Sequence, residues 1–169
     1  MKYKIIATDM DDTLLNSSHE ISKENIQSII EVQEKGVKFV LASGRPTFAM
    51  HSFANELDMK RLGGYILGYN GGEIIDVSTG DIIFEKALTR GDIEVIYNEA
   101  KNNELSFLTY SDDTIYGDEW NDYTTEEVTL TGMKWKEINS FDELPIEKSI
   151  KCIDRKSTRL NSSHLVLSR

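Results

Sequence analysis

Apolar residues in the first half of the chain occur as short continuous runs, separated by segments with helical spacing. The runs at residues 4–8, 37–42 and 65–68 have the length of buried strands, and each gives way abruptly to polar residues. Between the first two runs, isoleucine and valine side chains recur on one side of a helix that Ser22 can cap. Residues 4–42 therefore predict a strand–helix–strand unit with parallel strands and a right-handed crossover.

After residue 72 the pattern changes from crossover units to hairpins. Two apolar runs flank Ser78-Thr79-Gly80 and predict a hairpin, and Thr89 with Asp92 forms a capping-box pattern. A helix is predicted at residues 90–102, strands at 105–110, 114–117 and 149–153, and a loop with helical turns at 118–140. The pattern indicates an α/β fold, with a parallel sheet in residues 1–82 followed by a smaller α+β domain in residues 83–154.

The composition narrows the choice of partners and compartment. The 169 residues carry a formal net charge of −10, which argues against nucleic acid or an anionic membrane surface as a partner. No apolar stretch approaches the roughly 20 residues of a membrane span, and the chain begins directly with a predicted strand. The single cysteine, Cys152, excludes an internal disulfide and is expected to be a buried packing residue. These features favour a cytoplasmic protein of undetermined oligomeric state.

The end of the chain differs in composition from the rest. All 29 acidic residues lie at or before Asp154, and residues 155–169 contain none. The run from Arg155 to His164 resembles translated sequencing-adapter read-through, so residues 155–169 are predicted to be non-native. A disordered basic tail or a short amphipathic helix is the structural alternative.

The first apolar run ends in a cluster of acids. Asp9, Asp11 and Asp12 follow it directly, which places their carboxylates at the carboxyl edge of a strand, where open α/β sheets bind ligands. Like charges at this spacing repel and need a partner, and oxygen ligands at a sheet edge suit a hard cation such as Mg²⁺. A solvated acidic turn is the alternative.

The segment Asp9-Met10-Asp11-Asp12-Thr13-Leu14 resembles the first motif, DxDGT, of the haloacid dehalogenase-like (HAD) phosphohydrolases. Asp12 stands where that motif most often has glycine, and an unusual backbone angle is therefore expected there. The resemblance implies that Asp9 attacks phosphorus and that Asp11 is the general acid and base. It also implies that the Asp9 carboxylate and the Asp11 main-chain carbonyl hold Mg²⁺, and that the Met10 N–H binds a phosphoryl oxygen.

Two further loops follow the next two predicted strands. Ser43-Gly44-Arg45 begins 34 residues after Asp9 and resembles the second HAD motif, in which a hydroxyl residue and glycine bind phosphate. Arg45 can either hold phosphate or clamp an acidic loop. The pair Asn70-Gly71 is a simple turn or, by resemblance, a substrate contact beside the entrance to the site.

The order of the parts resembles the Cof-type (subfamily IIB) branch, whose large cap follows the third strand and whose members resemble sugar phosphatases. The resemblance implies the N-terminal half of a HAD-like Rossmannoid core with an inserted, incomplete α+β cap. The family's lysine motif and its GDxxND motif do not occur in the sequence. A C-terminally truncated, inactive fragment is therefore expected, with an unpaired sheet edge and uncovered apolar faces.

The implied function is that of a Mg²⁺-dependent phosphomonoesterase acting on small phosphorylated metabolites, sugar phosphates above all. A phosphomutase of the same superfamily and a catalytically dead phosphate-binding fragment are the alternatives. A signalling receiver domain also has acids after its first strand, but its phosphoacceptor ends the third strand. Here the third strand ends at Gly68-Tyr69-Asn70 without an acid, which argues against that class.

Overall fold

The computed structural model describes residues 3–155. The chain divides into two compact units, Met1–Glu85 and Lys86–Arg169. Of the segment predicted to be non-native, Arg155 is the last residue of a strand, and residues 156–169 lie outside the described part of the chain. Within residues 3–155, no helix is long and apolar enough to cross a membrane.

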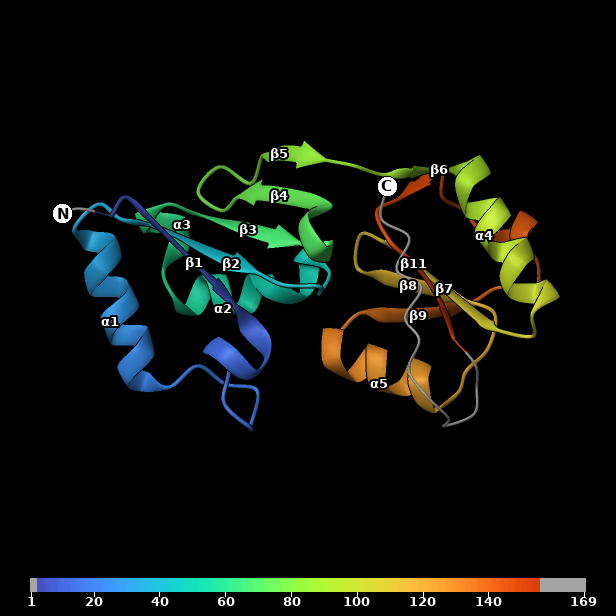
Figure 1. The fold of residues 1–169 in the computed structure, drawn as a ribbon, viewed down its shortest axis with the longest axis horizontal. Coiled ribbons are helices and arrows are strands. Elements are labelled where there is room, and N and C mark those ends of the chain that lie inside the picture. The colour runs from blue at the N-terminus through green and yellow to red at the C-terminus, as the bar shows by residue number, and fades with distance from the viewer. Residues whose placement is uncertain (1–2, 156–169) are drawn as a thin grey trace. The chain divides into compact units, whose positions relative to one another are not determined.

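The first unit contains a five-stranded sheet in the order β1-β2-β3-β4-β5 (Figure 1). Its strands are β1 (Ile5–Asp9), β2 (Lys38–Ala42), β3 (Gly64–Gly68), β4 (Glu73–Asp76) and β5 (Ile82–Glu85). Strands β1, β2 and β3 are parallel, while β4 and β5 form the predicted antiparallel hairpin. The predicted α/β class is confirmed, and three parallel strands end at the same edge of the sheet.

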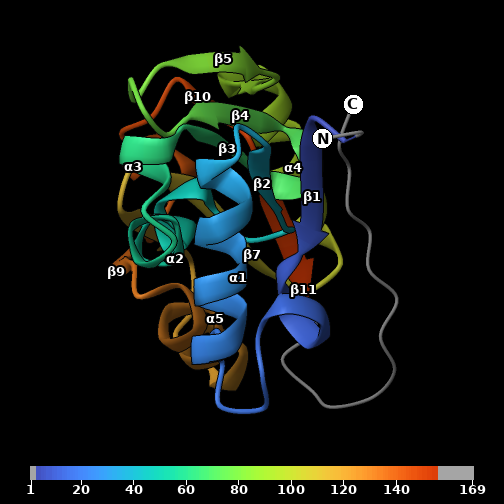
Figure 2. The ribbon, with the colours of Figure 1, turned by 90° about the vertical axis from the view of Figure 1, so that its left-hand side faces the viewer.

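Three helices cover one face of this sheet. They are α1 (Lys23–Glu34), α2 (His51–Glu56) and α3 (Met59–Leu62). The Ser22 side chain caps α1 as predicted, accepting a hydrogen bond of 3.2 Å from the Asn25 N–H. Apolar side chains of the helices pack against Phe39, Leu41 and Ile66 of the central strands. Figure 2 shows α1 in front of the strands.

Strand β1 forms one edge of the sheet. Among the described residues it pairs with β2 alone, and its apolar residues Ile5 and Ile6 are 57% and 39% exposed. A parallel strand is ordinarily buried on both faces, so this edge carries the exposed apolar surface expected from the sequence.

The second unit has a four-stranded sheet in the order β11-β7-β8-β9 and a small ladder of β10 with β6. Its strands are β6 (Leu88–Thr89), β7 (Ser106–Ser111), β8 (Thr114–Gly117), β9 (Lys134–Glu137), β10 (Lys148–Ser149) and β11 (Cys152–Arg155). Helix α4 (Arg90–Asn102) begins with the predicted capping box of Thr89 and Asp92. Its side chains Ile93, Tyr97 and Ala100 belong to the core of this unit.

Two predictions for the second unit were wrong. Residues 118–140 are not a loop with helical turns, because they contain helix α5 (Asp122–Thr131) and strand β9. The helix is capped by Asn121, which accepts from the Thr124 N–H, and it ends at Gly132 with φ +66°. Its buried side is made of Thr124, Glu127 and Thr131, so apolar spacing did not reveal it. The strand predicted at residues 149–153 is instead divided between β10 and β11.

Candidate functional site

The predicted site residues lie on the three loops that follow β1, β2 and β3. Asp9 is paired in register with Ala42, and Ala42 with Leu67, so the three strands end level with one another. Ser43, the next residue after β2, donates its backbone N–H to the Leu67 carbonyl at 3.0 Å. Sequence segments that are 34 and 27 residues apart thus meet at one edge of the sheet, as the ends of parallel strands must.

The first loop, Met10–Leu14, is a turn closed by a hydrogen bond of 2.9 Å from the Leu15 N–H to the Met10 carbonyl, and Asp11 and Asp12 have non-helical backbone angles within it. Met10 is fully buried and belongs to the core, so its side chain is a packing group. Asp12 has φ +56°, which confirms the unusual backbone angle expected where the motif most often has glycine. Asp9 and Asp12 are both exposed.

Arg45 clamps Asp11. Its Nη2 lies 2.5 Å from Asp11 Oδ1 and its Nε lies 3.0 Å from Asp11 Oδ2, so the guanidinium binds both carboxylate oxygens. The Arg45 side chain is 6% exposed and that of Asp11 is 43% exposed, and the guanidinium carbon lies 5.8 Å from the centre of the Phe53 ring. Of the two functions open to Arg45 from the sequence, the structure shows the clamp on an acidic loop.

The second and third loops are joined by backbone hydrogen bonds. The Asn70 N–H donates to the Ser43 carbonyl at 3.1 Å, and the Tyr69 N–H donates to the Arg45 carbonyl at 2.9 Å. A Cβ atom on Gly44 would lie only 2.9 Å from Asn70 Oδ1, so glycine is what allows the Asn70 amide to approach this backbone. Ser43, Gly44, Arg45 and Asn70 are therefore brought together.

The third loop has an uncommon backbone. Tyr69, Asn70 and Gly71 have consecutive positive φ values of +52°, +55° and +91°. Asparagine and glycine tolerate this region, whereas tyrosine adopts it only when its surroundings impose it. The two hydrogen bonds to the Ser43 and Arg45 carbonyls are the contacts that impose it.

The site offers few oxygen ligands for a cation. Among residues 3–155, no group of three or more His, Cys, Asp or Glu side chains is placed to hold a metal ion. Because Arg45 binds both carboxylate oxygens of Asp11, the first loop offers a cation the exposed carboxylates of Asp9 and Asp12 together with main-chain carbonyls. Of these, the resemblance implies the Asp9 carboxylate and the Asp11 carbonyl. One carboxylate and one carbonyl fit Mg²⁺, which commonly keeps several of its waters.

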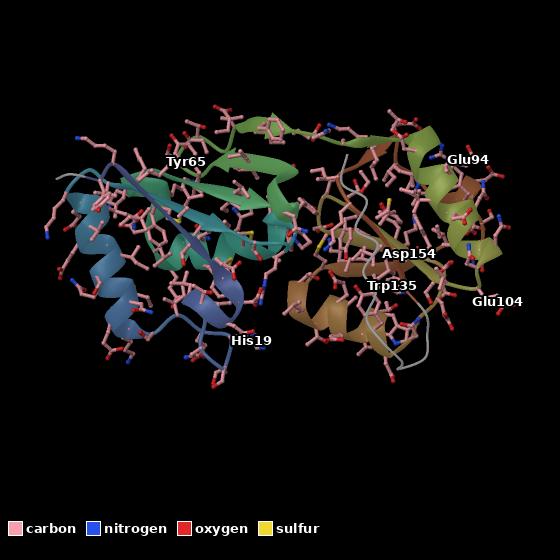
Figure 3. The ribbon with its side chains drawn as sticks, in the orientation of Figure 1. His19, Tyr65, Glu94, Glu104, Trp135 and Asp154 are labelled. Atoms are coloured by element: carbon pink, nitrogen blue, oxygen red, sulfur yellow. The ribbon has the colours of Figure 1, made fainter. Side chains whose placement is uncertain are left out.

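Two histidines of the first unit and the single cysteine of the second unit are not assigned to the site by the sequence. His19 is exposed in the loop before α1, and Figure 3 labels it there; His51 is also exposed, at the start of α2. Cys152 is buried, as predicted, and donates a hydrogen bond to Thr109 Oγ1 at 3.4 Å. Burial raises the pKa of its thiol to about 11, which makes it unreactive at neutral pH.

One contact at the site was not predicted from the sequence. The Thr47 hydroxyl, two residues after Arg45, donates to the carboxylate of Glu73, and both side chains are buried. The sequence contained one signal for this contact. Glu73 begins the predicted hairpin and alternates with the apolar residues Ile75 and Val77, so an acid stands where the pattern favours an apolar residue.

Comparison with known proteins identifies a family for the chain. The model of the haloacid dehalogenase-like hydrolase family matches residues 6–165. The 5-amino-6-(5-phospho-D-ribitylamino)uracil phosphatase YcsE of Bacillus subtilis (strain 168) is 30% identical over 127 residues, which are 75% of this chain and 49% of that protein. The chain spans 36% to 50% of the length of three curated relatives that it matches.

Solved structures show the same relationship. A haloacid dehalogenase-like hydrolase from Bacteroides thetaiotaomicron matches with a TM-score of 0.82 and 41% identity, over 90% of this chain and 58% of that one. The subclass IIB sugar phosphatase BT4131 matches with a TM-score of 0.70 and 19% identity, over 89% of this chain and 58% of that one. The chain therefore belongs to the haloacid dehalogenase-like hydrolase family, with the fold of its Cof-type, subclass IIB branch.

Proposed function

We propose that the site on the first unit is that of a Mg²⁺-dependent phosphomonoesterase acting on small phosphorylated metabolites. The observation that carries this proposal is the register of β1 with β2, which sets Asp9 beside the loop of Ser43, with Asp11 two residues further on. A nucleophile, a hydroxyl donor and an acid or base are thus present at one sheet edge.

In this proposal an Asp9 oxygen attacks phosphorus and forms an aspartyl phosphate while the ester P–O bond breaks. Asp11, once it is released from Arg45 and protonated, gives its proton to the leaving alkoxide; a water then attacks the aspartyl phosphate, gives its proton to Asp11 and releases phosphate and free Asp9. The Ser43 hydroxyl and the Met10 N–H bind phosphoryl oxygens. The Asp9 carboxylate and the Asp11 main-chain carbonyl are the groups that would hold Mg²⁺, whose chemistry is to neutralise phosphoryl charge.

The names of similar proteins support a sugar-phosphate substrate. YcsE is named for a phosphoribitylamino compound, and BT4131 is described as a sugar phosphatase. We assign the same substrate class, small phosphorylated metabolites and sugar phosphates above all, to the longer protein of which this site would be part. Asn70 and Gly71 are the proposed substrate contacts from the third loop.

We also propose that the 169-residue chain by itself turns over little or no substrate. Within residues 3–155 no group of three or more His, Cys, Asp or Glu side chains is placed to hold a metal ion, and Arg45 is already paired with Asp11. An aspartyl phosphate formed on Asp9 therefore lacks the neutralising groups that phosphoryl transfer requires. The same observation favours the second candidate function, a catalytically dead phosphate-binding fragment.

Trapping a phosphoryl analogue separates these proposals. The chain is mixed with Mg²⁺ and beryllium fluoride, and bound fluoride is followed by ¹⁹F NMR. A phosphoryl-transfer site gives a bound signal that is lost in Asp9→Asn and kept in the neighbouring control Asp12→Asn. No bound signal in the unmodified chain would support the dead fragment instead.

Turnover is measured separately with p-nitrophenyl phosphate and sugar phosphates. Hydrolysis that requires Mg²⁺ and disappears in Asp9→Asn would refute the proposal that the chain alone is inactive. Release of inorganic phosphate distinguishes a phosphatase from a phosphomutase, which would return the phosphoryl group to a second hydroxyl of the substrate.

A further inference from the structure

The loop formed by residues 43–47, called here the Arg45 loop, is the link between the other two loops of the site. On one side the Arg45 guanidinium binds Asp11 of the first loop. On the other side the Ser43 and Arg45 carbonyls accept backbone hydrogen bonds from Asn70 and Tyr69 of the third loop. Whatever fixes the Arg45 loop therefore fixes the position of Asp11.

The end of the Arg45 loop is held by an unusual buried contact. Glu73 is 7% exposed and is the first residue of β4, and the alternate residues after it, Ile75 in β4 and Val77 directly after the strand, are also buried. Burying a carboxylate is costly, and an apolar side chain at this position would serve packing better. Its hydrogen bond from the Thr47 hydroxyl offsets part of that cost.

The backbone is shaped to allow this contact. Gly68 is the strand partner of Glu73, and a Cβ atom on Gly68 would lie 2.5 Å from Thr47 Cγ2 and 3.2 Å from the Arg45 carbonyl oxygen. Glycine at the end of β3 thus lets Thr47 lie directly over the sheet, within reach of Glu73. Gly68 and Glu73 are paired on the neighbouring strands β3 and β4. Gly68 leaves room for Thr47, and Glu73 accepts its hydrogen bond.

We propose that Thr47 and Glu73 are positioning residues, whose hydrogen bond holds the Arg45 loop so that the guanidinium meets both oxygens of Asp11. Any effect of this arrangement on catalysis rests on the proposed function, because Asp11 is the residue proposed as general acid and base. The arrangement itself is a property of the first unit and does not depend on any activity. Glu73 acts through Thr47 and Arg45 and touches no reacting atom.

The test follows the Arg45 side chain directly. In ¹H–¹⁵N spectra, the Nε–Hε signal of an arginine bound to a carboxylate is displaced from that of a free arginine, and Arg45→Lys identifies the Arg45 signal. Arg61, whose Nε lies 2.5 Å from Asp58 Oδ2 on the surface, is the internal control. We expect Thr47→Val to move the Arg45 signal to the free position, Thr47→Ser to restore it, and neither to move the Arg61 signal.

A paired replacement separates positioning from stability. Thr47→Val with Glu73→Leu removes both polar groups and leaves no buried group unpaired, so the unfolding midpoint in urea should match that of the native chain or exceed it. We expect the Arg45 signal still to be lost in this stable variant. An Arg45 signal that stays in its native position there would overturn the proposal, since Thr47 and Glu73 would then contribute packing alone. Failure of beryllium fluoride binding would contradict the proposed function without affecting any of these signals.

Discussion

Arg45 and Asp11 form a pair whose two members differ widely in exposure: the arginine side chain is 6% exposed and the carboxylate 43%. The carboxylate can be hydrated if its partner is removed, whereas the guanidinium cannot. We therefore expect Asp11→Ala to lower the free energy of unfolding by about 3 kcal/mol and Arg45→Met by only about 1 kcal/mol. Urea unfolding measures both.

The double variant Asp11→Ala with Arg45→Met is the control for this asymmetry. It removes the buried charge together with its carboxylate partner and should be more stable than Asp11→Ala alone. Equal losses for the two single variants would contradict the burial difference on which the prediction depends.

The left-handed backbone of Asp12 gives a second prediction. At φ +56°, aspartate and asparagine are tolerated and glycine has no steric cost, whereas a β-branched residue is strained. Asp12→Asn and Asp12→Gly should unfold within about 1 kcal/mol of the native chain, and Asp12→Val should be less stable than Asp12→Asn by roughly 1–2 kcal/mol. A valine variant as stable as the asparagine variant would show that the turn does not hold this angle.

The exposed edge of the first sheet gives a third prediction. Ile5 is 57% exposed on β1, and an open apolar edge strand favours association between chains. Ile5→Lys should raise the concentration at which light scattering first increases and change the free energy of unfolding by less than about 0.5 kcal/mol. Ile66→Lys, at a fully buried position of β3, is the matched control and should unfold the unit.

Cys152 gives a fourth prediction, on the dependence of stability on pH. The pKa of its thiol is raised from 9.0 to about 11 by burial, so the folded protein keeps a proton that the unfolded chain releases. This contribution is fully present below pH 9 and is lost as the pH rises from about 9 towards 11. Cys152→Ala should remove that part of the pH dependence. Rapid alkylation of the folded protein at pH 8 would contradict the burial of the thiol.

The sequence predicted those features that depend on local chemistry. Ser22 and the pair Thr89 and Asp92 cap their helices as expected, because a cap requires only residues within three positions of each other. The backbone angle of Asp12 was predictable from the resemblance, because the motif most often has glycine at that position.

Features set by tertiary contact were not predictable in this way. Helix α5 buries Thr124 and Thr131, whose hydroxyls bond to backbone carbonyls of the same segment, and no apolar stripe marks it. The contact between Thr47 and Glu73 joins residues 26 positions apart. It depends on the sheet order β2-β3-β4, which brings the segment after β2 close to the start of β4. The contact of Arg45 with Asp11 likewise required the structure, since binding phosphate and binding an acidic loop need the same side chain.

The position of β1 at the edge of the sheet affects how precisely the Asp9 carboxylate is held. Asp9 is the last residue of β1. Within residues 3–155 this strand is paired on one side only, with β2, and the pairing runs from Ile5 opposite Lys38 to Asp9 opposite Ala42. Edge strands open more readily than central ones, while in-line attack tolerates errors of less than about 1 Å. A further strand paired with the other side of β1 would therefore hold the Asp9 carboxylate more precisely for in-line attack, even if that strand contributed no catalytic or metal-binding residue.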